Sequence, residues 1–440
     1  MRSMALAIPI VVCSVGGLAA TPRGQAPDKQ ALAVQVKGIF RKNCYRCHGQ
    51  NGTGEGGLDY VLDFKKLVGT EVIAGNPKKS KLFRKLASGE MPPESEPGPS
   101  EAEIAIVEKW IESGAPPPAE DPKPVRVTLD NFTRAESDTS FARFVKQGGF
   151  GKFHHERELA AIDNQTVIRL NRDTLYSFAV FDLDASPVTV TLPAVGKRYM
   201  AIQVINEDQY ALDVIYKPGP HAFTKETIGT RYVCLAIRTF VNPDDAADVK
   251  AVHALQDAIK VEQTEKGNFE VPSWDAASLK KIRDALLALA AANGGLDPLR
   301  MFGRKDRVDP VQHLIGTAAG WGGNPRTAAL YVGVEPKDNN GKTVYRLTVK
   351  DIPVDGFWSV SVYNKDGYFQ KNARNAYTVN NVTARPNTDG SVTIQFGGCN
   401  GEALNCLPIM PGWNYVFRMY RPRREILDGT WKLPEAQPLK

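Results

Sequence analysis

The stretch Cys44-Tyr45-Arg46-Cys47-His48 decides how the first part of this chain folds. On a helix, positions i, i+3 and i+4 share one face, so the two sulfurs and the imidazole point the same way. Thiols at this spacing can form thioethers with the two vinyl groups of a haem while the histidine coordinates its iron. Cys-x-x-Cys alone is ambiguous between a redox pair and half of a zinc site, but no second Cys/His pair at zinc spacing follows nearby. With the adjoining histidine, the motif predicts one covalent haem c per chain, held by Cys44, Cys47 and His48.

A helix is expected to lead into this motif. Asp28 can cap its start, and the apolar residues Leu32, Val36, Ile39 and Phe40 follow helical spacing. After the motif, residues 52–57 are rich in glycine, which lets the backbone pass close to a flat cofactor where side chains would collide. Without the neighbouring motif, this segment would be an ordinary flexible loop.

The second axial ligand should come from a later loop that faces the open side of the haem. Met91, in Gly89-Glu90-Met91-Pro92-Pro93, is the candidate, because the prolines stiffen the backbone after the thioether and need no amide partner. Ligation by histidine and methionine raises the reduction potential of a haem. The rival is a bis-histidine site with His154 or His155, which both lie beyond a proline-rich linker. We therefore predict His48 and Met91 as the two iron ligands.

A further helix follows the methionine loop. Ser100 and Glu103 form a capping-box pattern before an apolar helical stripe that ends at Gly114. The order of haem helix, glycine-rich segment, Met-Pro-Pro and terminal helix resembles a class I cytochrome c, which implies an all-α fold. The resemblance to the planctomycete-type cytochrome c domain is closer still and covers residues 32–118. It rests on these motifs: Gly56-Gly57-Leu58-Asp59, Ala74-Gly75-Asn76-Pro77, Ser80-Lys81-Leu82, Gly89-Glu90-Met91-Pro92-Pro93 and Trp110-Ile111-Glu112-Ser113-Gly114-Ala115.

The whole chain has 440 residues, of which 42% are hydrophobic and 24% charged, a length that suggests about three folded domains. Its net charge of +6 is too small and dispersed to indicate nucleic-acid binding.

An apolar run over residues 4–20 ends in small residues that offer a cleavage site, so residues 1–26 are expected to be a secretory signal peptide. An uncleaved membrane anchor is the alternative. Export agrees with haem c attachment, and we expect a periplasmic or otherwise exported protein.

Charge is arranged unevenly around Met91. Basic residues precede it and acidic residues follow it: Lys78, Lys79, Lys81, Arg84 and Lys85, then Glu90, Glu94, Glu96, Glu101 and Glu103. The simplest interpretation is a solvated helix face. The alternative is a docking patch beside the exposed haem edge for an acidic redox protein, whose attraction would weaken as salt rises.

Residues 116–124 are rich in proline and favour an extended, semi-rigid spacer, which marks a domain boundary. Beyond it, short β-branched segments separated by Pro, Gly, Asn and Asp predict an antiparallel sandwich, with strands at residues 167–170, 176–183, 188–192, 199–205, 211–216 and 232–237. Two helical stripes follow at residues 249–259 and 279–289, the second closed by Gly294-Gly295. Strands return at residues 345–349, 358–363, 392–396 and 415–420.

These segments resemble the two-part bacterial family of domains of unknown function called DUF1254 and DUF1214, over residues 164–431. The first half carries Asn171-Arg172-Asp173-Thr174-Leu175-Tyr176-Ser177, Phe181-Asp182-Leu183 and Arg198-Tyr199. The second half carries Gly356-Phe357-Trp358-Ser359-Val360-Ser361-Val362-Tyr363, Asp366-Gly367, Asp389-Gly390-Ser391 and Leu427-Asp428-Gly429-Thr430-Trp431. The resemblance implies an immunoglobulin-like β-sandwich, a helical insert and a jelly-roll. It implies little chemistry, because the family has no settled reaction.

Cys399 and Cys406 bracket a short loop rich in glycine and asparagine, and an exported protein could join them in a structural disulfide. Two unpaired thiols are the alternative. Where relatives usually carry Asn-Trp-Leu-Pro, this chain has Asn405-Cys406-Leu407-Pro408, so we expect a disulfide to brace the loop in place of an aromatic residue. Cys234 lies in an apolar strand pattern and is expected to be buried.

No catalytic motif stands out in the second part. The pattern Gly-x-Ser-x-Gly is absent, so a serine hydrolase of the α/β class has no support. Asn171-Arg172-Asp173 could bind an anionic or hydroxylated ligand, but a buried ion pair between strands is the simpler interpretation. His154-His155-Glu156 could bind a metal but is expected at the surface. Trp321 and Trp358 are expected in the core. The catalytic residues, if any, stay unknown.

Together these patterns predict a multidomain chain: an all-α cytochrome c domain, then an all-β Ig-like sandwich, a helical insert and a β jelly-roll. The expected boundaries are a signal peptide at 1–26, the cytochrome c domain at 28–118, a linker at 119–127, the sandwich at 128–243, the insert at 244–330 and the jelly-roll at 331–434.

The predicted function is single-electron transfer by an exported monohaem c-type cytochrome whose larger module docks a redox protein partner or handles a small-molecule substrate. Two alternatives stay open. The larger module is itself an enzyme, a hydrolase or oxidoreductase with the haem as accessory carrier, or it is a non-catalytic ligand-binding module. No nucleic-acid partner is expected, and a membrane is expected only through an uncleaved leader.

Overall fold

The computed structural model describes residues 28–93, 96–119, 123–165, 168–401 and 403–439. The chain divides into two compact units, residues 1–122 and 123–440, and the division falls inside the predicted proline-rich linker. The predicted signal peptide lies outside the described residues. None of the described helices is both long and apolar enough to cross a bilayer.

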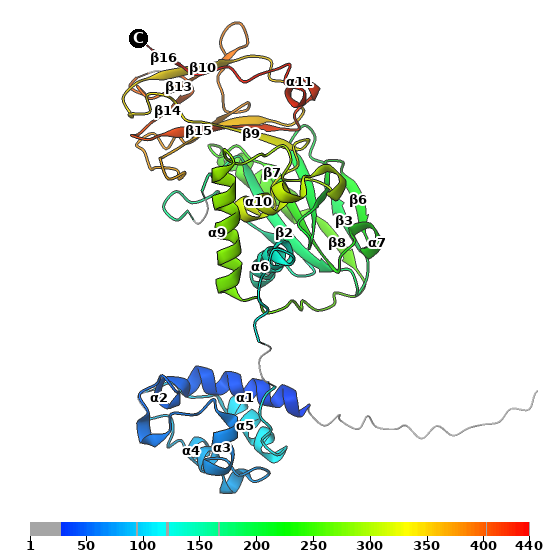
Figure 1. Cartoon of the computed structure of the whole chain (residues 1–440), viewed down its shortest axis with the longest axis vertical. Helices are drawn as coiled ribbons and strands as arrows, with labels where there is room; N and C mark the ends of the chain where they lie inside the picture. Colours follow the sequence, from blue (N-terminus) through cyan, green and yellow to red (C-terminus); the bar gives the residue numbers. More distant parts are fainter. Residues whose placement is uncertain (1–27, 94–95, 120–122, 166–167, 402, 440) are drawn as a thin grey trace, which may run out of the picture. The chain divides into compact units, whose positions relative to one another are not determined.

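The first unit is built from helices (Figure 1). Its main helices are α1 Lys29–Asn43, α2 Tyr45–His48, α3 Phe64–Thr70, α4 Lys81–Ala87 and α5 Glu101–Glu112, with short 3-10 turns at Glu55–Gly57 and Pro77–Lys79. Two caps predicted from the sequence are present. Asp28 accepts a hydrogen bond from the amide of Gln30 at 2.9 Å, and Ser100 and Glu103 form a reciprocal capping box at the start of α5.

The core of the first unit lies between α1 and α5. Trp110 is fully buried, and its ring centroid lies 6.1 Å from that of Phe40 and 5.3 Å from that of Phe64. Its indole N–H donates to the carbonyl oxygen of Pro116 at 2.8 Å, so the one polar atom of this large ring is satisfied. The packing holds α1, which leads into the cysteine motif, against the terminal helix.

The second unit begins with two antiparallel sheets. The five-stranded sheet has the order β1-β2-β7-β4-β5, and the three-stranded sheet has the order β6-β3-β8. Their strands are β1 His154–His155, β2 Thr174–Asp182, β3 Val188–Leu192, β4 Met200–Asn206, β5 Ala211–Ile215, β6 Gly219–Phe223, β7 Tyr232–Phe240 and β8 Lys260–Gln263. One apolar core, which includes Val190, Ile202 and Leu235, joins the two sheets.

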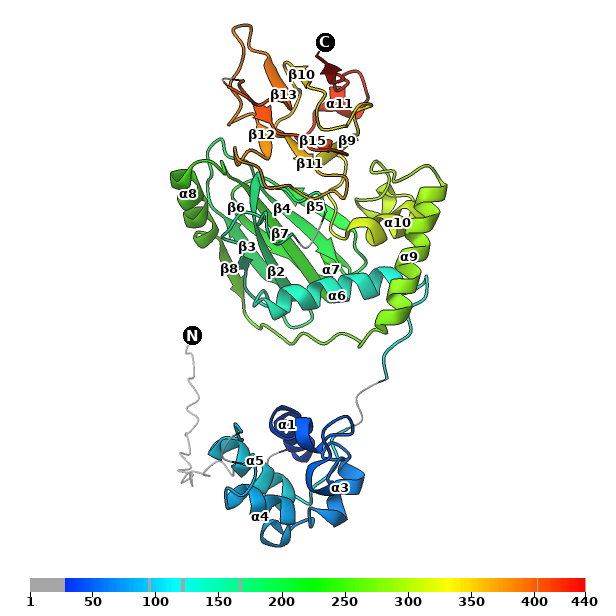
Figure 2. The ribbon, with the colours of Figure 1, turned by 90° about the vertical axis from the view of Figure 1, so that its left-hand side faces the viewer.

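Helix α6 Phe132–Lys146 lies across the other face of the five-stranded sheet, and α9 Ala276–Ala292 and α10 Pro310–Gly320 pack with α6 (Figure 2). Helices α7 Lys225–Ile228 and α8 Ala246–Asp257 lie at other edges (Figures 1 and 2). Phe141 and Phe144 of α6 pack with Val180 and Cys234 of the sheet. Cys234 is fully buried, as predicted.

Two further sheets stack at the C-terminal end of the second unit (Figure 1). Their orders are β12-β11-β15-β9 and β14-β13-β10-β16, and all neighbours are antiparallel except the short β13–β14 pair. The strands are β9 Ala329–Val334, β10 Tyr345–Val349, β11 Trp358–Tyr363, β12 Thr378–Asn380, β13 Val392–Phe396, β14 Cys406–Leu407, β15 Asn414–Tyr420 and β16 Gln437–Pro438, with α11 Arg424–Leu427 between the last two. The predicted disulfide is present: Cys399 and Cys406 are bonded, with their Cα atoms 5.6 Å apart.

The coarse prediction of a helical first part followed by antiparallel sheets is confirmed, and the finer Ig-like and jelly-roll labels stay predictions. Three local predictions are wrong. Helix α6 lies in a segment expected to contain only strands, and β8 lies within the expected helical insert, where it pairs with β3. The predicted strand at 167–170 is a turn over its described residues, because Arg169 adopts a φ of +54° and its amide donates to the carbonyl oxygen of Gly367.

Candidate haem site

The cysteine motif lies at a break between two helices. Cys44 ends α1 and begins α2, and its amide donates to the carbonyl oxygen of Phe40 at 2.9 Å. The carbonyl oxygen of Cys44 then accepts from the amides of Cys47 at 3.2 Å and His48 at 2.9 Å, so the motif forms one helical turn. Both thiols are half-buried and neither is in a disulfide. The thiols are therefore available for another covalent bond.

The orientation of His48 is set by a backbone carbonyl. Its Nδ1 lies 3.2 Å from the carbonyl oxygen of Leu58. A carbonyl oxygen can only accept, so Nδ1 is the donor, and in the neutral ring Nε2 is then the nitrogen with the free lone pair. Neutral histidine held by a hydrogen bond at one ring nitrogen is the form that binds a metal through the other. The sequence patterns did not identify Leu58, because a backbone oxygen has no side-chain signature.

The predicted ligands line the same groove. Two adjoining pockets share Cys44, His48 and Met91 in their walls. Apolar side chains and prolines make up about half of the remaining lining: Phe40, Leu58, Val61, Leu82, Leu86, Pro92, Pro93, Pro97 and Pro99. Most of the other lining residues are charged: Lys42, Arg46, Glu55, Glu71, Lys81, Lys85 and Glu96. A groove with two thiols and an imidazole at one wall, a thioether in the lining and apolar sides has the donor set that haem c requires. The residues present fit the predicted cofactor.

Two glycines allow the chain to turn tightly after the motif. A Cβ atom on Gly49 would lie 2.3 Å from the ring of Tyr45, and one on Gly52 would lie 2.6 Å from the carbonyl oxygen of Arg46. Neither position has room for a side chain. Farther along the glycine-rich segment, Glu55 and Gly56 reach the groove wall, as expected for backbone that passes close to a flat cofactor.

Ion pairs surround the groove. Arg46 and Glu96 are 2.5 Å apart, and both line it. The hydrogen bond to Glu96 and the nearby Cys47 raise the pKa of Arg46. Burial, together with the neighbouring Cys47, raises the pKa of the Cys44 thiol to about 11. Cys44 is therefore a neutral thiol near pH 7 in the polypeptide alone.

The basic cluster before Met91 is only partly neutralised. Lys81 pairs with Glu71 at 3.3 Å, and Lys85 pairs with Glu90. The remaining three cations are exposed and form no ion pair with any Asp or Glu in the described part of the chain: Lys78, Lys79 and Arg84. Of the acidic residues predicted to follow, Glu94 lies outside the described residues.

The rival histidines belong to the second unit. His154 and His155 form β1, and Nδ1 of His155 lies 2.8 Å from the hydroxyl of Ser177. Burial and the charge of Arg157 lower the pKa of His155 to about 4, so it is neutral at pH 7. No group of three or more metal-binding side chains occurs among the residues with described positions. These two histidines were expected at the surface, and both are half-buried.

The Asn171-Arg172-Asp173 motif braces the second unit. Asp173 is fully buried and accepts hydrogen bonds from Asn380 at 2.9 Å and Thr378 at 3.3 Å, on β12. Arg172 instead donates to the carbonyl oxygen of Ala160. The predicted ion pair between strands is therefore replaced by neutral hydrogen bonds, and burial raises the pKa of Asp173.

The predicted core positions of two tryptophans are confirmed. The ring centroid of Trp321 lies 5.7 Å from that of Phe141, and its indole N–H donates to the hydroxyl of Ser137 at 2.9 Å. Trp358 is 7% exposed and stacks on Phe417.

Family models match three segments, in the predicted order. The model described as Planctomycete cytochrome C matches residues 44–95, the protein of unknown function DUF1254 matches residues 150–225, and the protein of unknown function DUF1214 matches residues 329–424. These matches confirm the predicted resemblance: residues 44–95 are similar to the planctomycete-type cytochrome c family. The two later segments are similar to the DUF1254 and DUF1214 families.

Solved structures resemble the chain in fold. A crystal structure of a protein from Vibrio parahaemolyticus aligns with a TM-score of 0.54 and 18% identity, covering 71% of this chain and all of that one. A putative uncharacterized protein from Burkholderia cenocepacia aligns with a TM-score of 0.40 and 12% identity, covering 81% of this chain and 92% of that one. No curated protein gives a significant match. The likeness to the first structure extends to the fold alone.

Proposed function

We propose that this chain is an exported electron carrier with one covalently attached haem c. The observation that carries the proposal is the placement of Cys44, His48 and Met91 along the same partly apolar groove. The match to the planctomycete cytochrome c family over residues 44–95 supports it independently. The haem, when bound, supplies a one-electron couple between ferric and ferrous iron.

Each residue of the groove has a distinct role in this proposal. Cys44 and Cys47 hold the two thioether bonds, so the cofactor stays attached in either redox state. His48 presents Nε2 to the iron because Leu58 occupies Nδ1. Met91 supplies a thioether sulfur, which favours the reduced iron and raises the potential. The apolar part of the lining, which includes Phe40, Leu58 and Leu86, would lower the local dielectric at the haem, and this also favours the reduced state.

The exposed cations of the segment before Met91 are the docking side in this proposal. Lys78, Lys79 and Arg84 present positive charge that no described acid neutralises, and they suit an acidic redox protein. Charge reversal at Lys78 and Lys79 should slow electron transfer to an acidic partner at low ionic strength and have little effect at high ionic strength. Transfer rates that do not depend on salt would count against this docking side.

The proposal also includes the fold and the role of the second unit. We propose that its two pairs of packed sheets are an Ig-like sandwich and a jelly-roll, joined through the helical residues between them. It serves as a docking or ligand-handling module for the electron carrier. Export of the chain is proposed because covalent haem c is attached outside the cytoplasm. The Cys399–Cys406 disulfide agrees with export, since disulfides persist in oxidising compartments.

The experiment that tests the function is production of the full chain in a host that attaches haem c. Covalent haem should remain after denaturation in the wild-type protein and be lost when Cys44 and Cys47 are both changed to Ala. Met91→Leu should keep covalent haem but lose the weak red absorption band of methionine-ligated ferric haem, and its reduction potential should fall. Met410→Leu, in the second unit, is the matched control and should change neither the absorption band nor the reduction potential. Retention of the band in Met91→Leu would show that Met91 is not the iron ligand.

A further inference from the structure

A polar pocket in the second unit lies apart from the haem groove. Its cavity volume is about 500 Å³, within the range of small-molecule sites. Its walls come from α6, the turn after β4, the segment from α7 to the start of β7 and the segment before α9. The lining includes Asp138, Glu207, Arg231, Tyr232 and Trp274. Nothing in the haem-carrier function uses these residues.

A buried carboxylate in the wall of the pocket has one oxygen without a hydrogen-bond partner. Asp138 is 1% exposed, and its Oδ2 accepts a hydrogen bond from the indole N–H of Trp274 at 2.9 Å. Its Oδ1 is buried and has no hydrogen-bond partner among the described residues. A buried carboxyl oxygen without a partner is costly, and most such atoms in proteins are satisfied. A ligand that forms a hydrogen bond at this oxygen would remove the cost.

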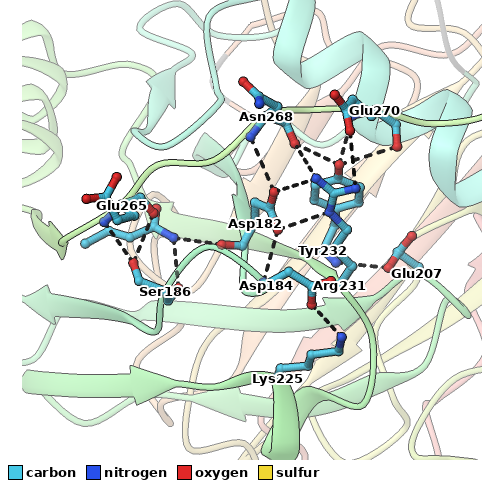
Figure 3. A network of polar contacts seen from close by, with 11 residues as sticks. Asp182, Asp184, Ser186, Glu207, Lys225, Arg231, Tyr232, Glu265, Asn268 and Glu270 are labelled. Atoms are coloured by element: carbon cyan, nitrogen blue, oxygen red, sulfur yellow. Dashed lines mark hydrogen bonds and ion pairs between the residues drawn. The ribbon is translucent and has the colours of Figure 1, made fainter.

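The cations of the pocket are already paired. Arg231 lies between Asp182, at 2.8 Å, and Glu270, at 3.6 Å (Figure 3). Lys225 pairs with Asp184 at 2.6 Å in the same network. The third cation, Arg134, pairs with Asp208 at 2.6 Å and lies 3.6 Å from Glu207. An anionic ligand would therefore have to compete with carboxylates for every guanidinium and ammonium group.

A cationic ligand is also disfavoured. Three cations line the wall (Arg134, Lys225 and Arg231), and they balance the lining acids Asp138, Glu207 and Glu270 in number. The described residues include no metal-binding group of three or more side chains, so a metal ion has no ligand set here. The charge balance favours a neutral molecule. A hydroxyl group suits Asp138 because it can donate to the ionised carboxylate or accept from the protonated one.

Aromatic side chains supply a complementary apolar surface. Trp274 and Tyr232 both line the pocket. Their polar atoms are engaged elsewhere: the indole N–H with Asp138, and the Tyr232 hydroxyl with the backbone of Asn268 and Glu270, at 2.8 Å each (Figure 3). Because Tyr232 is 1% exposed, the ring surface that a ligand can reach is that of the half-buried Trp274, against which the C–H face of a sugar or cyclitol packs.

We propose that this pocket binds a neutral, hydroxyl-rich ring compound of the monosaccharide or cyclitol class, with Asp138 as the hydrogen-bonding anchor and Trp274 as the apolar wall. The site does not involve the haem, so its test can fail without affecting the proposed electron-carrier function, and the reverse. The proposal names the class of ligand that the second unit would bind.

Ligand-observed NMR on the full chain tests the proposal, with D-glucose, D-galactose and myo-inositol as neutral probes and choline and succinate as charged comparators. Saturation transfer to at least one neutral probe is expected. Asp138→Asn should weaken that binding by about tenfold to a hundredfold, because a hydrogen bond to a charged group is lost. Asp284→Asn, on the exposed face of α9, is the matched control and should leave it unchanged.

A second variant covers the case in which Asp138→Asn does not fold. Val271→Phe, on an irregular and half-buried part of the lining, should fill the cavity and abolish binding while leaving the polar network intact. Absence of saturation transfer to all three neutral probes would overturn the proposal. Binding of choline or succinate in their place would do the same, and so would neutral binding that neither variant weakens.

Discussion

Replacing Asp138 by Asn is expected to stabilise the second unit at neutral pH and to have little effect under acidic conditions. Burial raises the pKa of Asp138 from 3.8 to about 6. The hydrogen bond from Trp274 and the charge of Arg134 oppose that shift, while the charges of Glu207 and Asp208 reinforce it. The folded protein therefore holds this carboxyl group in its neutral form at a pH where the unfolded chain has already ionised it.

The size of the effect follows from the two pKa values. A shift of about two units corresponds to about 3 kcal/mol between the protonation states. Below pH 3.8 the carboxyl is protonated in both states and contributes nothing. Between 3.8 and about 6 the folded state binds more protons than the unfolded state, so the free energy of unfolding falls as pH rises. Above about pH 6 the carboxyl is ionised in both states, and the full cost of burying its charge lowers the free energy of unfolding. The amide introduced by Asp138→Asn cannot ionise, and its oxygen can still accept from Trp274.

Urea unfolding of the full chain, followed for wild type and Asp138→Asn across this pH range, measures the effect. The difference in unfolding free energy between the two proteins cancels the contributions of all other titrating groups. It should grow by about 2 to 3 kcal/mol in favour of the variant from about pH 4 to about pH 8. A difference that stays flat, or one in which the wild type gains relative to the variant as pH rises, would falsify the assignment of a buried, unpartnered carboxyl.

Three other perturbations test the packing of each unit. Ser100→Ala removes the capping box of α5 and should cost about 1 kcal/mol in the unfolding of the first unit, with Ser113→Ala, at the other end of the helix, as a comparison. Trp110→Ala removes a fully buried ring and should cost about 3 to 5 kcal/mol, and an undetectable change in thermal unfolding would contradict the core described here. Changing both Cys399 and Cys406 to Ser opens a short loop and should cost about 2 to 3 kcal/mol in the second unit; equal stability with and without reductant in the wild type would show that the bond contributes nothing.

The candidate haem site could be predicted from the sequence because haem c attachment requires fixed local spacing. Two thioethers and an iron ligand must come from one helical turn, so Cys44, Cys47 and His48 predict the cofactor without any tertiary information. Met91 is separated from them by more than forty residues and was predicted from the proline pair and the family resemblance. The carbonyl of Leu58, which fixes the histidine, has no sequence signature at all.

The strands of the second unit were predictable where one face is apolar and turn residues mark the ends. The predicted segment at 188–192 coincides with β3, and those at 345–349 and 358–363 coincide with β10 and β11. Strands that consist of two to four residues, such as β14, were not predicted because their pairing depends on distant partners. Strand β8 was missed for the same reason, since its only described partner is β3, about seventy residues earlier.

Helix α6 shows why the second unit's pocket escaped the sequence patterns. Its buried face carries the polar residues Glu136, Ser137 and Asp138 beside its phenylalanines, so no apolar stripe with helical period stands out. Each of the three has a partner from a distant segment: Arg283 pairs with Glu136 at 2.7 Å, and tryptophans donate to the other two. Predictions from local patterns treat polar residues as solvent-exposed. They fail where polar groups are buried at a cost in stability. A buried helix without an amphipathic pattern therefore indicates buried polar groups and a candidate ligand site. In this chain that helix is α6, and the polar group is Asp138.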